Sequence, residues 1–466
     1  MKKLICLFLT AILVLGLCAC AGSEGGGNAK NSGLQAGFGR VNITPDYPVS
    51  LAGYSNYDTR ISTGYLDYLY VTCIAVTDGN DTILMFTMDQ CSASYANFYD
   101  ELLISINAAT QIPKDKIFIG ATHTHGAPMI TYGSENNKRY RQEVVSAAGQ
   151  AGKAALEDLA PCQMLQTATK VEGMNFVRHY KVADGTYYGS NFGDASPGLV
   201  GHAAEPDDQL ILLKFDRAED KQDILMVNWQ AHPDHTAWND YYAITADFVG
   251  VMRSALELDT DMLVGYYGGA SGDLNPFSEI PEVNHGLNMY QYGEKMAQYA
   301  QEALATLTPV EGTAIKTVSK VHTFSINHDW DYLVGRAREV LSENNQNGRD
   351  SANKLAVEYG MSSIYHANAI INQVSLGQTE DRVLDAFCIG NIGFIQAKCE
   401  MFSGSAKYIK ENSPFAQTVV IASNNAYIPT EEAFEYRCYE SDTSRFVRGS
   451  AEKMNADFVE MLQSLK

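Results

Sequence analysis

His123 and His125 are the residues of this chain whose type and spacing most directly suggest chemistry. They close the segment Ile-Phe-Ile-Gly-Ala-Thr-His-Thr-His-Gly-Ala-Pro at residues 117–128. The apolar run predicts a buried strand, and on an extended backbone alternate side chains point the same way. Ligand crevices in α/β folds lie at the carboxyl ends of strands. The pattern favours a metal site, or one ligand beside an acid–base group; two hydrogen-bonded structural histidines are the alternative.

Three more residues with metal-binding side chains lie near predicted strand ends. His232 follows Trp229 by three positions, His235 comes shortly after, and Glu400 follows the apolar stretch 392–397. Two histidines and one glutamate form a known catalytic zinc set that leaves a coordination position open for water. A surface histidine and a helix-capping glutamate are the structural alternatives. Whether His232 or His235 belongs to the set stays open.

Other familiar catalytic patterns are missing from the sequence. The glycine-rich segment 268–276, Gly-Gly-Ala-Ser-Gly-Asp-Leu-Asn-Pro, has neither the Lys-Ser/Thr of a P-loop nor the G-x-G-x-x-G spacing. We therefore exclude nucleotide binding there and expect a close backbone approach to a substrate or a metal crevice. Ser271 does not stand in a G-x-S-x-G nucleophile elbow. The cysteines form no C-x-x-C pair, which makes a cysteine zinc site improbable.

The elements that position these residues alternate between strands and helices, with some hairpins between them. A mixed sheet is therefore expected, in one large α/β domain over residues 36–466. The polar, helix-prone stretch 329–363 looks inserted, because strands are predicted on both sides of it. We expect strands over 69–77, 82–88, 209–215, 223–229, 262–267, 382–388 and 392–397, and another that begins at 117 and carries His123 and His125 at its carboxyl end. Helices are expected over 95–109, 137–159, 248–258, 289–307 and 450–465.

The amino-terminal segment indicates export. Two lysines precede an apolar run over residues 4–17, and Leu17-Cys18-Ala19-Cys20 resembles the cleavage box of bacterial lipoproteins. We expect a signal peptide over 1–19, a lipidated Cys20 that anchors the protein to the outside of the bacterial cell membrane, and a flexible tether over 20–35. An uncleaved membrane anchor is the alternative. The net charge of −21 argues against nucleic acid as a partner.

A series of short motifs, taken in order, resembles the neutral/alkaline (non-lysosomal) ceramidase family. Only Ala-Thr-His-Thr-His is specific by itself, whereas the ordered series is a strong signal. The resemblance covers the catalytic amino-terminal domain of that family. The matching segments are 37–45, 121–128, 175–178, 228–233, 272–276, 400–402 and 439–440.

The resemblance implies a mixed α/β ceramidase fold and a zinc amidase. By motif match, the metal ligands are His123, His232, Glu400 and Tyr439. The catalytic or substrate-contacting groups are His125 and Arg178, with Tyr439 counted in both sets. One departure is Asn275, which stands where the family has a serine in Gly-Asp-Val-Ser-Pro.

The function expected from this sequence is zinc-dependent hydrolysis of the amide bond of an N-acyl compound through metal-activated water. Ceramide or a related N-acyl amine is the substrate that the family resemblance implies. Two alternatives remain. One is a zinc hydrolase of an ester or a different small amide, and the other is a surface lipoprotein that binds a ligand without catalysis.

Overall fold

The computed structural model describes residues 33–54, 59–131, 133–189, 198–218, 220–237 and 240–466. The expected signal peptide, the lipidated Cys20 and nearly all of the tether lie outside these residues. The first strand, β1, begins at Gln35. Among the described residues, no helix has the length and apolar character needed to cross a membrane.

The largest sheet has nine strands in the order β14-β12-β11-β6-β1-β3-β4-β5, with β16 paired to β6. Only β4–β5 and β12–β14 pair in parallel, so the predicted mixed sheet is confirmed. The sheet has two halves, because β1 meets β6 through only two residue pairs. Its strands are β1 Gln35–Asn42, β3 Tyr70–Thr77, β4 Thr82–Met88, β5 Ile117–Ala121, β6 Ala160–Lys170, β11 Gln209–Arg217, β12 Ile224–Trp229, β14 Leu263–Gly268 and β16 Thr308–Pro309.

A second sheet of four strands packs against both halves of the first. It has the order β17-β18-β19-β21, with bounds Ile315–Ser325, Thr379–Ile389, Ile392–Ala397 and Gln417–Ala422. Phe118 of β5, Tyr267 of β14 and Phe387 of β18 belong to one buried cluster. The rings of Phe118 and Phe387 have centroids 4.1 Å apart. Their burial against one another fixes how the strand ends of the sheets meet.

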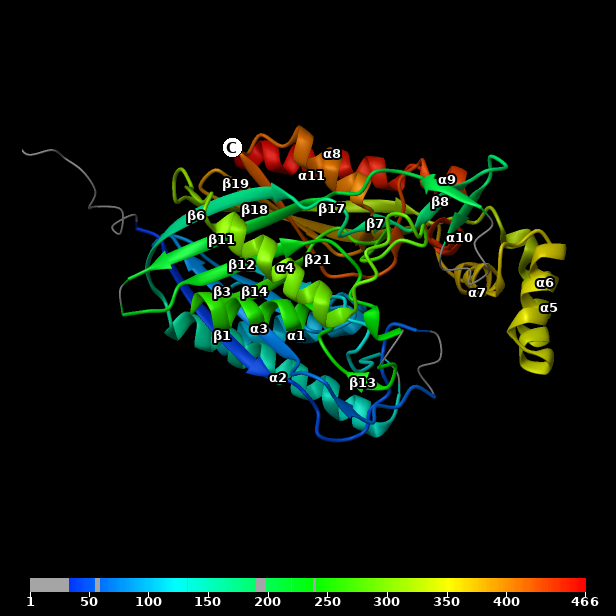
Figure 1. Cartoon of the computed structure of the whole chain (residues 1–466), viewed down its shortest axis with the longest axis horizontal. Helices are drawn as coiled ribbons and strands as arrows, with labels where there is room; N and C mark the ends of the chain where they lie inside the picture. The colour runs from blue at the N-terminus through cyan, green and yellow to red at the C-terminus, as the bar shows by residue number, and fades with distance from the viewer. Residues whose placement is uncertain (1–32, 55–58, 132, 190–197, 219, 238–239) are drawn as a thin grey trace, which may run out of the picture.

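Amphipathic helices cover the outer faces of the sheets (Figure 1). The helices α1 Ala96–Thr110 and α2 Glu135–Glu157 bury their apolar stripes on the β1-β3-β4-β5 half. On the other half lie α3 Phe248–Thr260 and α4 Met289–Leu304. The four-stranded sheet is covered by α8 Ser403–Asn412 and α11 Ser450–Leu465.

Three helices stand between β17 and β18 and form a small unit with its own core. They are α5 Val334–Asn347, α6 Arg349–Glu358 and α7 Ile364–Gln373. Val340, Ala356 and Ile370 pack together inside this unit. The helices run to Gln373, past the predicted end of the insertion at residue 363. Ser325 pairs with Thr379, so the chain leaves the sheet and returns to it at adjacent points.

Shorter elements complete the fold around the ends of the main strands. These are β2 Gly64–Tyr65, β7 Phe176–Val177, β8 His179–Val182, β9 Tyr187–Gly189, β10 Leu199–His202, β13 Ala243–Ile244, β15 Leu274–Asn275, β20 Glu400–Met401, β22 Tyr427–Ile428, α9 Ala433–Tyr436 and α10 Tyr439–Thr443.

Candidate active site

Three side chains from distant parts of the sequence converge on one point. His123 follows β5, His232 follows β12, and Glu400 begins β20. Nε2 of His123 lies 3.0 Å from Nε2 of His232 and 3.4 Å from Oε2 of Glu400. Nε2 of His232 lies 3.6 Å from the same carboxylate oxygen. Tetrahedral zinc with bonds of about 2.0–2.1 Å requires donors about 3.3 Å apart, so this spacing fits the metal.

The second nitrogen of each histidine is fixed by the backbone. Nδ1 of His123 lies 2.5 Å from the carbonyl oxygen of Cys91, and Nδ1 of His232 lies 3.1 Å from that of Leu274. Because a carbonyl only accepts, both Nδ1 atoms carry the proton and both Nε2 lone pairs face the centre. A backbone partner of this kind orients metal-binding histidines in many zinc sites.

The third donor also fits a cation. Oε2 of Glu400 is buried and forms no hydrogen bond with the described residues. An ionised oxygen in that position is costly unless a positive charge compensates it. Burial alone would raise the pKa of Glu400, but His123, and after it His232, hold it well below the usual range. Burial and the charge of Arg178 lower the pKa of His232 to about 4, which keeps that imidazole neutral for ligation.

The path of the backbone at the two neighbouring histidines differs from the sequence prediction. A continuous strand through His123 and His125 was expected, but β5 ends at Ala121 and His123 has φ 68°. The two imidazoles still converge, with Nε2 atoms 3.5 Å apart. The turn forms because the amide of His123 donates to the carbonyl of Gln90 at 3.0 Å instead of continuing the ladder. A non-glycine residue with such a φ costs about 1 kcal/mol or more and is typical of functional sites.

His125 lies beside the donor cluster and lines the pocket. Its Nδ1 is buried and forms no hydrogen bond with the described residues, and the ring of Tyr54 meets its ring edge-on at 5.1 Å between centroids. Burial, and after it the neighbouring His123, hold the pKa of His125 well below its usual value. The backbone of Gly53, at φ 93°, packs directly on this ring, where a Cβ would collide with the imidazole.

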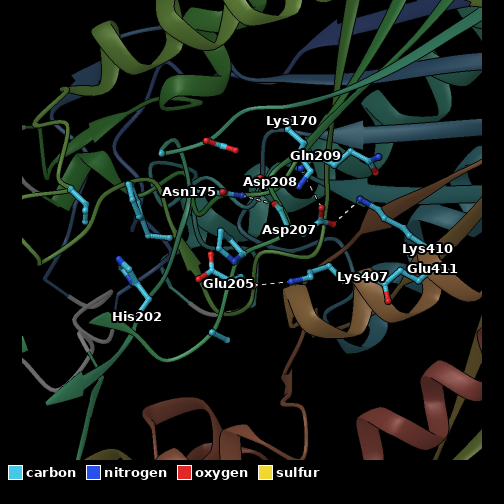
Figure 2. A pocket seen from close by; sticks show the side chains of 16 residues that line it. Lys170, Asn175, His202, Glu205, Asp207, Asp208, Gln209, Lys407, Lys410 and Glu411 are labelled. Carbon is cyan, nitrogen blue, oxygen red and sulfur yellow. Dashed lines mark hydrogen bonds and ion pairs between the residues drawn. The ribbon is translucent and has the colours of Figure 1, made fainter. Parts of the chain in front are cut away.

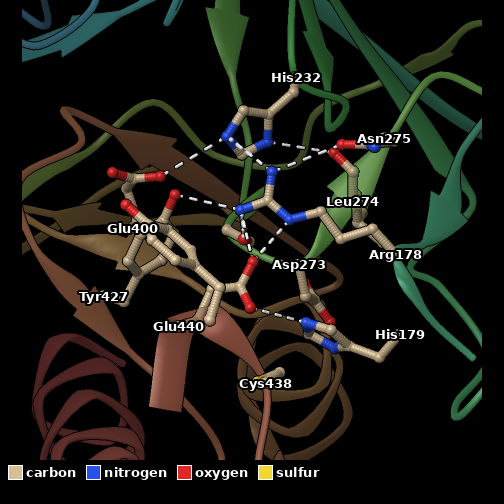
Figure 3. Close-up of polar contacts among 12 residues, drawn as sticks. Arg178, His179, His232, Asp273, Leu274, Asn275, Glu400, Tyr427, Cys438 and Glu440 are labelled. Atoms are coloured by element: carbon tan, nitrogen blue, oxygen red, sulfur yellow. Dashed lines mark hydrogen bonds and ion pairs between the residues drawn. The ribbon is translucent and has the colours of Figure 1, made fainter. Parts of the chain in front are cut away.

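Arg178 approaches the cluster from the opposite side and is almost fully buried. It donates to Oε1 of Glu440 at 2.6 Å and to the carbonyl of Gly272 at 3.0 Å. Its NH1 atom lies 3.4 Å from both Nε2 of His232 and Oδ1 of Asn275 (Figure 3). The guanidinium is therefore aimed at the same centre as the three donors. Gly272 also packs against the backbone of Glu400, so this part of the glycine-rich segment lies beside the donor cluster.

Sequence reasoning missed two residues that hold Arg178 in place. Glu440 is buried, and its second oxygen, Oε2, lies 2.8 Å from Nε2 of His179 (Figure 3). His179, Cys438 and Glu440 are close enough together to suggest a second metal cluster. However, Arg178 and His179 already occupy both oxygens of this carboxylate, so the group is an ion-pair clamp. The sequence offered one clue to these two residues, which is that each directly follows a predicted site residue: Glu440 follows Tyr439, and His179 follows Arg178.

Tyr439 and His235, the remaining candidates, lie in different surroundings. Tyr439 is the first residue of α10 and lines the same pocket as His125 and Arg178. Burial, together with the charge of Glu400, raises its pKa. His235 instead bonds through Nδ1 to Oδ1 of Asp247 at 3.0 Å, and its ring packs on Phe248 and Tyr292. The structure thus brings His232, and not His235, next to His123 and Glu400.

The pocket in front of these groups has a volume of about 450 Å³. It gives a small molecule access to the donor cluster from one side. Its lining residues are Gly53, Tyr54, His125, Arg178, His232, Asp234, Tyr241, Arg349, Tyr365, Tyr427 and Tyr439.

A larger hollow of about 650 Å³ lies elsewhere and has different chemistry (Figure 2). One ion pair lies within it, the 2.7 Å bond from Lys410 to Asp207. Lys407 similarly donates to the carbonyl of Glu205 at 3.2 Å. None of the three histidine, cysteine and carboxylate clusters found among the described residues lines it. The smaller pocket is therefore the candidate active site.

Comparison with known proteins identifies the fold. No family model matches the sequence, and no curated protein matches it. Among solved structures, the neutral ceramidase of Pseudomonas aeruginosa aligns with a TM-score of 0.69 and 14% identity, over 93% of this chain and 74% of that one. A ceramidase complexed with C2 aligns with a TM-score of 0.67 and 15% identity, over 93% and 75% of the two chains. The resemblance to neutral ceramidase is confirmed at the level of the fold.

Proposed function

We propose that this chain, which has the fold of neutral ceramidase, is a zinc-dependent hydrolase that cleaves the amide bond of an N-acyl compound. The observation that carries the proposal is the convergence of His123, His232 and Glu400 at 3.0, 3.4 and 3.6 Å. Their fixed tautomers and the unsatisfied carboxylate oxygen support a cation at that point. Tyr439, on the wall of the same pocket, is proposed as the fourth ligand by motif match.

Bound zinc supplies a Lewis acid for the amide carbonyl and lowers the pKa of water to about 7. Arg178 supplies a fixed positive charge, and its NH1 atom faces the centre where negative charge develops on the carbonyl oxygen. A donor held in place before the reaction is worth about 3 kcal/mol or more in such sites. Glu440 and His179 prevent the guanidinium from turning away.

His125 is the proposed acid–base group. It is neutral because of its burial, it lines the pocket, and its Nε2 lies 3.5 Å from Nε2 of His123. A neutral imidazole there can accept a proton from the attacking water and return it to the leaving nitrogen. Without that proton the amine is a poor leaving group, so His125 is expected to affect turnover rather than metal binding.

Two alternative functions would use the same residues. Hydrolysis of an ester would need less help at the leaving group, and the protonation role of His125 favours the amide. A ligand-binding protein without catalysis would gain nothing from an arginine aimed at three metal donors. Ceramide itself is the substrate that the fold suggests.

The test combines metal content with turnover. Zinc in the purified protein is quantified, and hydrolysis of a set of N-acyl amines is measured before and after chelation and after zinc is restored. We expect about one zinc per chain and amide hydrolysis that disappears and returns with the metal. Hydrolysis that survives complete removal of zinc would contradict the proposal.

A further inference from the structure

The lining of the candidate active-site pocket consists of polar and aromatic residues. It consists of five tyrosines, two arginines, two histidines, one aspartate and one glycine. No aliphatic side chain is found among these residues, which all belong to the described part of the chain. Pockets that bind apolar ligands are lined by hydrophobic and aromatic side chains with only a small number of polar groups, whereas here every lining residue except Gly53 carries a polar group. This lining therefore suits a polar N-acyl compound better than a long alkyl chain.

The two arginines of the pocket differ in how their charge is balanced. Arg178 is buried and neutralised by Glu440. Arg349, the first residue of α6, is exposed and stacks on the ring of Tyr365 at 4.9 Å. Among the described residues, Asp234 included, no carboxylate lies within ion-pair distance of Arg349. Its charge is therefore available to a ligand.

A row of aromatic rings connects Arg349 to the reaction centre. The ring of Tyr427 lies 5.8 Å from that of Tyr439, and the ring of Tyr439 lies 5.3 Å from that of Tyr365, on which Arg349 stacks. Arg178 lies over the other end of the row, 5.8 Å from the centre of the Tyr427 ring. A substrate that extends along this wall from the donor cluster would bring its far end to the guanidinium of Arg349.

We infer that the substrate is an N-acyl compound with a carboxylate or similar anionic group several atoms from the scissile amide, and that Arg349 binds this group. A guanidinium matches a carboxylate through two parallel hydrogen bonds. The net charge of −21 repels anions from the protein as a whole, so an unpaired arginine in the pocket is a local exception. The inference rests on the proposed amide hydrolase function.

The experiment uses matched pairs of small amides. N-acetyl ω-amino carboxylates of increasing length are each compared with the N-acetyl ω-amino alcohol of equal length. A second series places the carboxylate on the acyl half, as half-amides of dicarboxylic acids. At one length in one series, we expect kcat/KM to favour the carboxylate about five- to tenfold. In Arg349→Gln this preference should disappear through KM, while hydrolysis of the alcohol stays unchanged.

Arg336→Gln is the matched control, because Arg336 is also exposed in the helical unit and stacks on a tyrosine, Tyr359, outside the pocket. It should leave the preference intact. The same pairs are titrated into zinc-free protein, where binding is measured without turnover. Tighter binding of the carboxylate that is lost in Arg349→Gln supports the inference even if the hydrolase proposal fails. Equal binding, or a preference unaffected by Arg349→Gln, overturns it, as would strict selectivity for long-chain ceramide.

Discussion

At the scale of single residues, His232 and His235 provide the sharpest test of the metal site. They lie three positions apart, yet one faces the donor cluster and the other bonds to Asp247, the N-cap residue of α3. We expect His232→Ala, like His123→Ala and Glu400→Ala, to lose both zinc and turnover. His125→Ala should keep zinc and lose most of its activity, since that ring stands beside the proposed ligands.

His235→Ala should keep its zinc and lose stability instead. The substitution leaves the buried carboxylate of Asp247 without one hydrogen bond, which costs about 1–3 kcal/mol. Zinc quantification and thermal unfolding of the five alanine variants separate the two effects. Metal loss in His235→Ala together with metal retention in His232→Ala would reverse the assignment.

Glu440 is expected to act through Arg178 and not on the substrate. In Glu440→Gln, the buried charge of Arg178 loses its partner, so we expect a loss of about 3 kcal/mol in the free energy of unfolding. Turnover should fall about tenfold or more while zinc content is unchanged. Glu435→Gln is the control, because Glu435 forms an exposed ion pair with Arg448, and it should behave as the wild type. Loss of zinc in Glu440→Gln would contradict a purely positioning role.

The same clamp predicts how stability depends on pH. Burial alone would raise the pKa of Glu440, but the charges of Arg178 and His179 hold it well below its usual value. A depressed folded-state pKa stabilises the protein above the unfolded pKa, about 4.3, and this contribution is lost as the pH falls below it. Between pH about 5 and 3, the unfolding free energy should therefore fall more steeply for the wild type than for Glu440→Gln. The free energy of unfolding is measured by chemical denaturation at each pH. If it falls equally steeply with pH in the two proteins, the assignment is contradicted.

At the scale of elements, the sequence predicts the helices and strands whose apolar residues recur at a regular spacing and face the core. The helix predicted over Ser450–Leu465 is found with those bounds, because its apolar residues recur at helical spacing and face a sheet. The strands β6 and β17 were missed. Much of β17 is exposed or half-buried, so its pairing with β18 through eleven residue pairs stabilises it without an apolar pattern. Hydrogen bonding to a distant strand leaves no local signal.

The candidate site shows the same limit. Residue types and strand ends identified His123, His232 and Glu400 one by one. What brings their donor atoms together is the packing of the two sheets, as in the 2.6 Å bond from Gln396 of β19 to the carbonyl of Ile119 in β5. The spacing of apolar residues along the chain does not predict such contacts between residues far apart in sequence. The clamp formed by Glu440 and His179 was missed for the same reason.

The helical unit between β17 and β18 should be separable from the metal site. It has its own core, and its ends meet where the amide of Ile326 donates to the carbonyl of Gln378 at 2.9 Å. Residues 327–377 can therefore be replaced by Asn-Gly, which closes a two-residue hairpin. All three central donors lie outside this unit, so we expect a folded protein with about one zinc per chain.

Turnover of that variant should nevertheless fall more than tenfold, because it lacks Tyr365 and loses the packing of α7 on α10, which begins with Tyr439. Circular dichroism, gel filtration and zinc analysis establish whether the shortened chain is intact before kinetics are compared. If zinc is lost together with activity, the helical unit supports the metal site itself and the expectation fails.

At the scale of the whole molecule, the strong negative charge bears on where the protein acts. An acidic protein is repelled by anionic lipid headgroups, so electrostatics alone would not hold it at a bacterial membrane surface. A lipid anchor would hold it there regardless of charge, since acyl chains bind through buried methylene groups. We therefore propose that lipidated Cys20 tethers the chain to the outer side of the cell membrane, with the active-site residues, from Gly53 onward, held away from the bilayer by residues 20–35.

Cys20→Ser should move the protein from the membrane fraction to the soluble or secreted fraction without changing the activity of the isolated protein, because no residue of the candidate active site precedes Gly53. Cys18→Ser is the matched control. It alters a cysteine two positions earlier that would be removed with the signal peptide, so it should leave membrane fractionation unchanged. Mass spectrometry of the amino-terminal peptide identifies the modification directly. A wild-type chain that is soluble and begins well beyond residue 20 would refute lipidation while leaving export possible, because cleavage at another position still requires passage through the membrane.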